Sequence, residues 1–165
     1  MKTKLKLKNY CTFPSKEWGE DGGYSCDVYY DDKKVFYFCN YGDGSEPKVV
    51  WENSEIQQNV FDEMSRLSKF KTEIDGFTRK MLKEHNVWGL VDFLVELEGD
   101  YKFAEKAFKE GNNVVVSVSY AYSLTRKSYI ATVENKNDLL SWIKETMSPK
   151  DSLEALRIYL KEEDK

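Results

Sequence analysis

The stretch from Tyr24 to Gly44 constrains the fold of this chain more than any other part of the sequence. It reads YSCDVYYDDKKVFYFCNYGDG, in which two runs rich in aromatic and β-branched residues flank the polar residues Asp31–Lys34. Two such runs joined by a short polar segment are typical of a tight β-hairpin. The pattern predicts strands over Tyr24–Tyr30 and Val35–Tyr41, followed by a glycine-rich turn. The fold must therefore contain a sheet that accommodates many aromatic side chains.

Pairing Tyr30 with Val35 sets the register of this hairpin and places Cys26 directly opposite Cys39. Because side chains alternate between the faces of a strand, this register divides the hairpin into two sets. One face carries Cys26, Val28, Tyr30, Val35, Tyr37 and Cys39. The other face carries Asp27, Tyr29, Phe36 and Phe38. Such a hairpin either lies inside the fold or presents a face to a partner, and both interpretations stay open. We expect Cys26 and Cys39 to be free thiols packed on one face.

At 165 residues the chain is expected to form a single domain with a substantial core. Hydrophobic residues make up 41% and charged residues 33% of the sequence, as is normal for a soluble globular protein. No apolar run approaches about 18 residues, the length that indicates a membrane-spanning helix. The N-terminal stretch MKTKLKLKNY lacks the apolar core of a signal peptide. We therefore expect a cytoplasmic protein with no membrane partner.

A strand is expected at the N-terminus, where Lys2–Lys8 reads KTKLKLK. The alternation places Thr3, Leu5 and Leu7 on one face and four lysines on the other, which is typical of a half-buried strand. Lysines protect an exposed sheet edge from aggregation, and we favour that role over contact with phosphate groups. A further short strand is predicted around Lys48–Trp51.

Three helices are predicted between the two β-rich parts of the chain. The first covers Ser54–Lys71, since the sequence SEIQ at its start is a capping box. The second covers Asp75–His85. The third covers Val87–Glu98, and Gly99 is expected to break it before an amphipathic turn over 101–109. The inward-facing residues are Ile56, Val60, Met64 and Leu67 in the first helix, Phe77 and Met81 in the second, and Leu90, Val91, Leu94 and Leu97 in the third.

A second hairpin and two short helices are expected to complete the chain. The hairpin pairs Val114–Tyr122 with Lys127–Glu134, and a helix over Asn137–Met147 follows. A last helix begins at Ser148, since Pro149 suits a first helical position. The apolar stripe of that helix is Leu153, Leu156 and Leu160.

The order of these elements predicts the α+β class, because runs of strands and runs of helices are separated along the chain. The expected architecture is an antiparallel sheet built from the N-terminal strand and the two hairpins, packed against helices. Residues 1–52 are then β-rich, residues 53–111 are helical, and residues 112–165 hold the second hairpin and two helices.

The sequence carries no catalytic or metal-binding signature, so enzyme activity is disfavoured and no cofactor is expected. A P-loop, a dinucleotide fingerprint and an HExxH motif are missing, and His85 is the single histidine. The spacing of the three cysteines matches no zinc site. The turn Gly42–Ser45, with Asp43, offers an alternative function as a small-molecule or nucleotide-binding site. Tyr120 or Tyr122 would then supply a stacking ring.

Charge gives a further indication of the partner. The segment Glu17–Glu46 holds eight acidic residues against Lys33 and Lys34, a local balance of −6. An acidic and aromatic surface repels nucleic acid and attracts basic protein surfaces. The net charge of −4 for the whole chain also disfavours nucleic-acid binding.

The N-terminal pattern LKLKN…YSCDVYYDDKKVFYFCNYGDG resembles the opening of a group of small uncharacterised bacterial and phage proteins. These proteins pair a lysine-rich strand with a hairpin of the form aDVYvDGKKvgyasNdGhGG. In this chain Asp32 stands at the turn glycine, and Tyr41–Gly44 stands where the group has a histidine-containing ending. The resemblance implies an origin in a phage or mobile element and brings no established activity.

From these observations we expect a non-catalytic, protein-binding accessory protein that inhibits a host defence system. The partner is expected to be a protein, and the sequence does not identify it or the oligomeric state. The residues expected to contact the partner are the acidic and aromatic side chains of the first hairpin and the turn that follows it: Tyr29, Asp31, Asp32, Phe36, Phe38 and Asp43.

Overall fold

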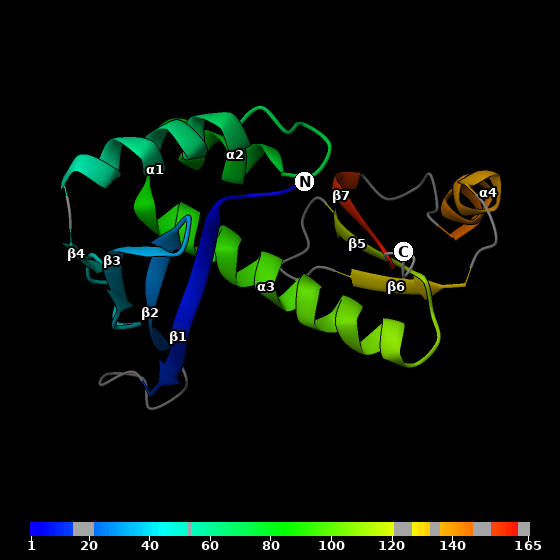
Figure 1. Ribbon diagram of the computed structural model, residues 1–165, viewed down its shortest axis with the longest axis horizontal. Helices are drawn as coiled ribbons and strands as arrows, with labels where there is room; N and C mark the ends of the chain where they lie inside the picture. Colours follow the sequence, from blue (N-terminus) through cyan, green and yellow to red (C-terminus); the bar gives the residue numbers. More distant parts are fainter. Residues whose placement is uncertain (15–21, 53, 121–126, 133–135, 147–152, 162–165) are drawn as a thin grey trace. The chain divides into compact units, whose positions relative to one another are not determined.

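The computed structural model describes residues 1–14, 22–52, 54–120, 127–132, 136–146 and 153–161. Within these ranges the chain forms seven strands and four helices, which Figure 1 labels. In chain order they are β1 (Leu5–Phe13), β2 (Gly23–Tyr30), β3 (Lys33–Asn40), β4 (Lys48–Trp51), α1 (Ser54–Leu67), α2 (Gly76–Lys83), α3 (Val87–Lys109), β5 (Val114–Tyr120), β6 (Lys127–Ala131), α4 (Lys136–Thr146) and β7 (Leu153–Leu160).

The strands form two antiparallel sheets, one in the order β1-β2-β3-β4 and one in the order β6-β5-β7. The predicted α+β class is confirmed, although the two hairpins lie in different sheets where the sequence analysis placed them in one. The chain has two compact units. The N-terminal unit comprises Lys2–Lys69 and Thr78–Glu96, and the C-terminal unit comprises Met1, Phe70–Phe77 and Leu97–Lys165. That these units act as a single domain stays a prediction.

The first hairpin turns in two residues instead of the predicted four. Asp31 and Asp32 have positive φ values of 46° and 63°, as both central residues of a type I′ turn require. Tyr30 therefore pairs with Lys33, and the register shifts after Tyr29 so that Val28 lies opposite Phe36. The shift inserts one extra residue on β3, which is a β-bulge.

This register corrects the predicted faces. A one-residue slip moves every following side chain of a strand to the opposite face. Phe38 therefore lies opposite Cys26, and Cys39 lies opposite Ser25, so the predicted Cys26–Cys39 pairing is wrong. Both cysteines are buried thiols that form no disulfide. Phe36 and Phe38 have no exposed surface, so neither ring projects into solvent as a partner-binding side chain would.

The helices of the N-terminal unit mostly follow the predicted stripes. In α1, Val60, Met64 and Leu67 are fully buried, as predicted, although the helix ends at Leu67. In α2 the prediction for Phe77 is wrong, because this side chain is 73% exposed and Leu82 is the buried residue of the helix. Two residues at helical spacing define a stripe weakly, so the buried face was placed on the wrong side.

Helix α3 runs without a break from Val87 to Lys109, so the interruption predicted at Gly99 is wrong. A glycine inside a helix costs only about 0.5–1 kcal/mol relative to alanine. Buried residues on both sides of the glycine, among them Leu97 and Ala104, supply more than that. Packing therefore overrides the local preference.

The helix predicted from Ser148 is also wrong, because Leu153–Leu160 forms strand β7. Leu153, Leu156 and Leu160 fit a helical stripe, but the chain pairs this segment with β5 over seven residue pairs. Alternate residues Ala155 and Arg157 are buried, whereas Leu160 is 59% exposed. The buried side chains follow the period of two that a strand has, and they include Arg157, a charged residue that no hydrophobic pattern places in a core.

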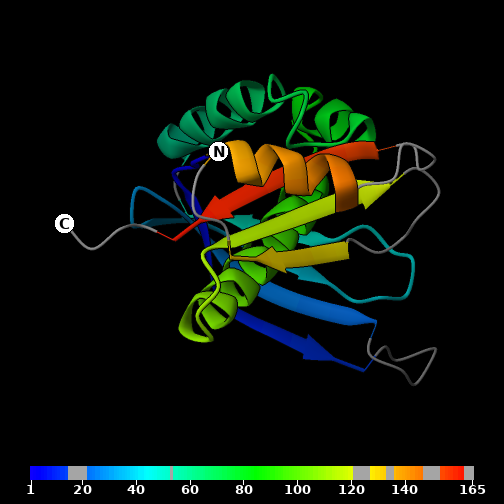
Figure 2. The ribbon, with the colours of Figure 1, turned by 90° about the vertical axis from the view of Figure 1, so that its right-hand side faces the viewer.

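Strand β5 is the centre of the C-terminal unit and is covered on both faces. Val114, Val116 and Val118 pack against Leu139 of α4, and Figure 2 shows that helix lying over the sheet. Val115 points the other way and packs against alanines of α3. The expected large face of this strand is confirmed for its three valines, whereas Tyr122 lies outside the described residues.

Asp100 of α3 is the buried polar centre of this unit. Its carboxylate pairs with Nη1 of Arg157 at 2.9 Å and accepts hydrogen bonds from the hydroxyls of Ser117 at 2.8 Å and Tyr159 at 3.0 Å. Arg157 also donates from Nε to the carbonyl oxygen of Glu73 at 3.0 Å. The side chains of Asp100 and Arg157 are only 7% and 3% exposed. These bonds compensate the cost of burying two charges.

We expect Asp32→Gly to stabilise the protein by about 0.5 kcal/mol. Glycine adopts a positive φ without strain, and the exposed ion pair of Asp32 with Lys6 contributes little. Urea denaturation measures the difference. Asp32→Ala is the matched control, since it loses the same ion pair but keeps the unfavourable φ. A glycine variant less stable than the alanine variant would contradict the type I′ turn.

We expect Asp100→Ala to lower the free energy of unfolding by about 3–5 kcal/mol, because it leaves the buried Arg157 charge without its carboxylate. The control is Lys102→Ala on the same helix, where the ion pair with Glu98 is exposed and the expected change is below about 0.5 kcal/mol. Equal effects of the two substitutions in urea denaturation would contradict this role of Asp100.

Candidate functional site

Two of the three acidic residues predicted to bind a partner, Asp31 and Asp32, are paired with lysines of the N-terminal segment. Asp31 lies 3.1 Å from Nζ of Lys4, and Asp32 lies 3.2 Å from Nζ of Lys6. The ammonium of Lys8 lies 4.3 Å from the ring centre of Tyr29, a cation–π contact. Tyr29, Asp31 and Asp32 are therefore brought together, but the acidic surface expected there is largely neutralised.

The acidic turn after the hairpin is closed by its own side chains. The carboxylate of Asp43 accepts hydrogen bonds from the amide of Ser45 at 3.0 Å and from its hydroxyl at 2.5 Å. Gly42 has a φ of 70°, and a Cβ there would lie 2.2 Å from the backbone of Gly22. This glycine is therefore required for close packing. These contacts are those of an ordinary turn, and the alternative of a nucleotide site at Gly42–Ser45 stays a prediction.

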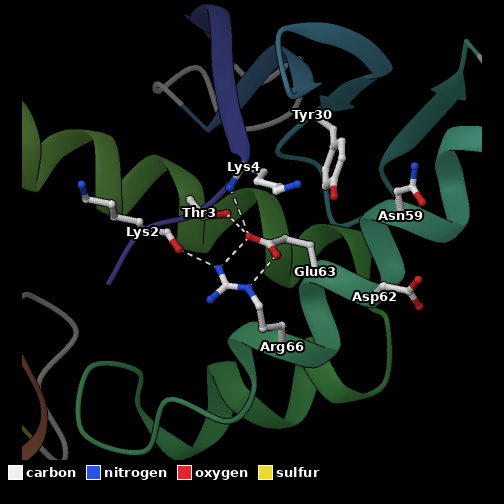
Figure 3. Close-up of a pocket in the computed structure, with 8 residues that line it drawn as sticks. All are labelled: Lys2, Thr3, Lys4, Tyr30, Asn59, Asp62, Glu63 and Arg66. Atoms are coloured by element: carbon white, nitrogen blue, oxygen red, sulfur yellow. Dashed lines mark hydrogen bonds and ion pairs between the residues drawn. The ribbon is translucent and has the colours of Figure 1, made fainter.

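A first cavity of about 530 Å³, the α1 pocket, lies beside the hairpin end. Figure 3 shows the lining side chains, which come from the N-terminal segment, the hairpin and α1. They are Lys2, Thr3, Lys4, Tyr30, Asn59, Asp62, Glu63 and Arg66. The cavity is open and lined mainly by charged groups, and its charges largely compensate one another.

Glu63 is the buried anchor of the α1 pocket. Its carboxylate accepts hydrogen bonds from the Thr3 hydroxyl at 2.9 Å, the Lys4 amide at 3.1 Å, and two nitrogens of Arg66 at 2.7 Å each. Arg66 also donates to the carbonyl oxygen of Lys2 at 2.6 Å, as the dashed lines of Figure 3 mark. Burial raises the pKa of Glu63, but these donors outweigh it, and the pKa lies below its ordinary value. The arrangement ties the N-terminal segment to α1.

The second feature is an aromatic cluster, which we define as Tyr10, Tyr24, Phe38 and Trp88 together with Asp92. The ring of Tyr24 stacks on buried Phe38, with centroids 5.6 Å apart, and lies 5.9 Å from the ring of Tyr10. The hydroxyl of Tyr24 donates a hydrogen bond to the carboxylate of Asp92. Tyr10 and Trp88 are 42% and 39% exposed. The cluster therefore exposes the rings of Tyr10 and Trp88 to solvent, whereas the ring of Phe38 in the same cluster is buried.

The cluster also perturbs its ionisable groups. Desolvation raises the pKa of Asp92, and hydrogen bonds from Tyr24 and Trp88 partly oppose that rise. Burial, followed by the bond to Asp92, raises the pKa of Tyr24. The raised pKa of Tyr24 keeps the proton on its phenol oxygen, so the hydroxyl stays a hydrogen-bond donor to Asp92 and the bond holds the ring in place.

A second cavity of about 400 Å³, the β4–α3 pocket, adjoins this cluster and shares Phe38 and Trp88 with it. The other lining residues come from β4, from the loop before it and from the start of α3. They are Glu46, Pro47, Val49, Asn86 and Val87. This cavity is mainly apolar, with one carboxylate and one amide at hand.

His85 does not complete a catalytic arrangement. Its Nε2 lies 2.8 Å from the Ser65 hydroxyl, and its ring stacks on Phe61 with centroids 4.8 Å apart. No carboxylate in the described part of the chain orients the imidazole, as a serine–histidine–aspartate triad requires. The contact ties the end of α2 to α1. Among the described residues no group of three metal-ligating side chains occurs.

Comparison of the chain with protein-family models, with curated proteins and with solved structures found no match. In the part of the chain that the structure describes, none of the helices has both the length and the apolar character needed to cross a membrane.

The aromatic cluster was not predicted from the sequence. Tyr10 and Trp88 stand alone in their segments, so no local pattern singles them out. Tyr24 was placed in the hairpin, but its contact with Asp92 joins residues 68 positions apart. The one available signal was Asn86, which caps α3 by accepting a hydrogen bond from the Gly89 amide at 3.0 Å. This cap sets the start of the helix at Val87, and Trp88 is therefore in its first turn.

We expect Glu63→Gln to destabilise the protein at neutral pH and to do so less as the pH falls. The folded-state pKa of Glu63 lies below the ordinary value of 4.5, so its ionised form contributes fully above that value. The contribution is lost as the pH falls through the folded-state pKa. Urea denaturation between about pH 7 and pH 3 measures the difference from the native chain.

Asp62→Asn is the control for this experiment, because Asp62 is the adjacent, exposed carboxylate of the same helix. Its effect is expected to be small at every pH. A Glu63→Gln effect that stays constant across the acid range would contradict the role of the ionised carboxylate.

Proposed function

We propose that this protein is a non-catalytic protein-binding module whose contact surface is the aromatic cluster with the adjoining β4–α3 pocket. The observation that carries the proposal is the pair of exposed rings of Tyr10 and Trp88, with the partly buried ring of Tyr24, beside an apolar cavity. Tyrosine and tryptophan are the residues most enriched at protein interfaces and among binding hot spots.

The geometry supports this use in two ways. The ring of Tyr24 is held on buried Phe38 and by its bond to Asp92, so little side-chain entropy is lost when a partner packs on it. The cavity beside Trp88 also offers a partner side chain an apolar surface to pack against.

The wider role proposed is that of a phage or mobile-element accessory protein, acting in the cytoplasm and inhibiting a host defence system. The resemblance of the N-terminal hairpin to small bacterial and phage proteins supports this class. The neutralised hairpin end, with Tyr29, Asp31 and Asp32, is the rival surface for the same function.

We expect Trp88→Ala to weaken binding of the partner at least about 30-fold, the effect of truncating a central aromatic anchor at about 2 kcal/mol. Partners captured from a lysate of the source cells are identified with the native chain, prepared in pure form, and titrated calorimetrically against each variant. Trp88→Phe keeps the apolar ring and is expected to retain most of the affinity. Circular dichroism confirms that the variants are folded.

The paired experiment uses Asp31→Lys combined with Tyr29→Ala at the rival surface. Binding that survives Trp88→Ala but is lost in this double variant would assign the interface to the hairpin end and overturn our choice of surface. Binding unaffected by either would show that neither surface meets the partner.

A further inference from the structure

The β4–α3 pocket has a defined chemistry within the aromatic cluster. Its lining is mainly apolar and includes Phe38, Pro47, Val49, Val87 and Trp88. The described residues that line it include one charged side chain, Glu46, and no basic one. An occupant therefore meets a hydrophobic cavity with a negative charge at its side.

Glu46 stands apart from the other acidic residues of the segment Glu17–Glu46. Five of these eight acids are described by the structure, and four of the five have a partner: Asp27, Asp31 and Asp32 pair with lysines, and Asp43 closes its own turn. Glu46 is exposed and makes no hydrogen bond or ion pair with any residue that the structure describes. It is thus the carboxylate of this segment whose charge the described fold does not use.

Asn86 adds a side-chain amide to the pocket wall, and its nitrogen can donate a hydrogen bond to an occupant. Its Oδ1 accepts the hydrogen bond from the Gly89 amide at 3.0 Å, which fixes the orientation of the side chain. Within the described ranges its Nδ2 donates to no acceptor. An amide nitrogen held in this way at a pocket wall is suited to a backbone carbonyl oxygen of a bound peptide segment.

We propose that the β4–α3 pocket receives an apolar side chain of the partner protein that is followed or preceded by a lysine or arginine, whose cation pairs with Glu46. This inference rests on the proposed function and names the chemistry of the partner. The apolar group is desolvated by Val49, Val87 and Trp88, and the basic residue supplies charge complementarity that steers the encounter. Asn86 donates to the backbone between them.

The test selects binders to the intact chain from a display library of random short peptides, and then titrates the selected sequences by fluorescence polarisation. We expect enrichment of an apolar residue adjacent to lysine or arginine. Glu46→Lys is expected to weaken these peptides at least about tenfold, and replacing their basic residue by glutamate is expected to restore binding to that variant. Asp62→Lys makes the same charge change in the α1 pocket and is expected to leave affinity unchanged.

Enrichment of acidic peptides, or equal effects of Glu46→Lys and Asp62→Lys, would overturn this inference. If the selected peptides depend on Trp88 but carry no basic residue, the inference fails and the proposed function stands. If no peptide binds and the partner protein binds without regard to Trp88, both fail.

Discussion

The register of the β2–β3 hairpin is the constraint on which the N-terminal unit depends. Two aspartates with positive φ close the turn, and one extra residue on β3 then sets Val28 against Phe36 and Cys26 against Phe38. A register one residue different would bring Phe38 to the opposite face of the sheet. Tyr24 would then lose the ring it stacks on, and the β4–α3 pocket would lose part of its lining.

Most of the described charged residues of the first hairpin form ion pairs with neighbouring residues and do not build a surface of one charge sign. When charges are summed along the sequence, the lysines of the N-terminal segment predict a basic surface that could bind phosphates. The acidic residues of the hairpin predict a separate acidic surface that could bind basic proteins. In the folded chain Lys4 and Lys6 lie within 3.2 Å of Asp31 and Asp32, so these charges offset one another as pairs. The informative charge is then the one left over, and a sequence sum cannot identify it.

Local patterns predicted what local physics decides. Runs of β-branched and aromatic residues located β2 to β5, and helical spacing located α1 and α4. The alternation over Lys2–Lys8 located only the start of β1, which runs from Leu5 to Phe13. The prediction for β7 failed because Leu153, Leu156 and Leu160 fit a helical stripe, whereas pairing with β5 makes the segment a strand that buries Ala155 and Arg157. The break at Gly99 failed because burial around it outweighed a small local cost.

The candidate site was the least predictable part, for a related reason. Phe38 was correctly placed on a strand but assigned to the surface, since its face depended on a bulge that no residue type announces. Tyr10 and Trp88 carry no signal at all until β1, β2 and α3 are brought together. The aromatic cluster forms only through tertiary contacts. The residues predicted to bind a partner were chosen because they are acidic or aromatic and lie in one segment of the sequence.

The Asp100–Arg157 pair has a consequence for the order in which the chain matures on the ribosome. The two residues are 57 positions apart, so at about 5–20 residues per second Arg157 is made about 3–11 s after Asp100. Every residue of the N-terminal unit precedes Leu97 and has been synthesised by then. The Asp100 carboxylate has to stay hydrated through this interval, because nothing yet balances its charge in the interior. The C-terminal unit therefore completes its core only after Arg157 has been synthesised. A nascent chain that stops before β7 leaves the core of this unit incomplete.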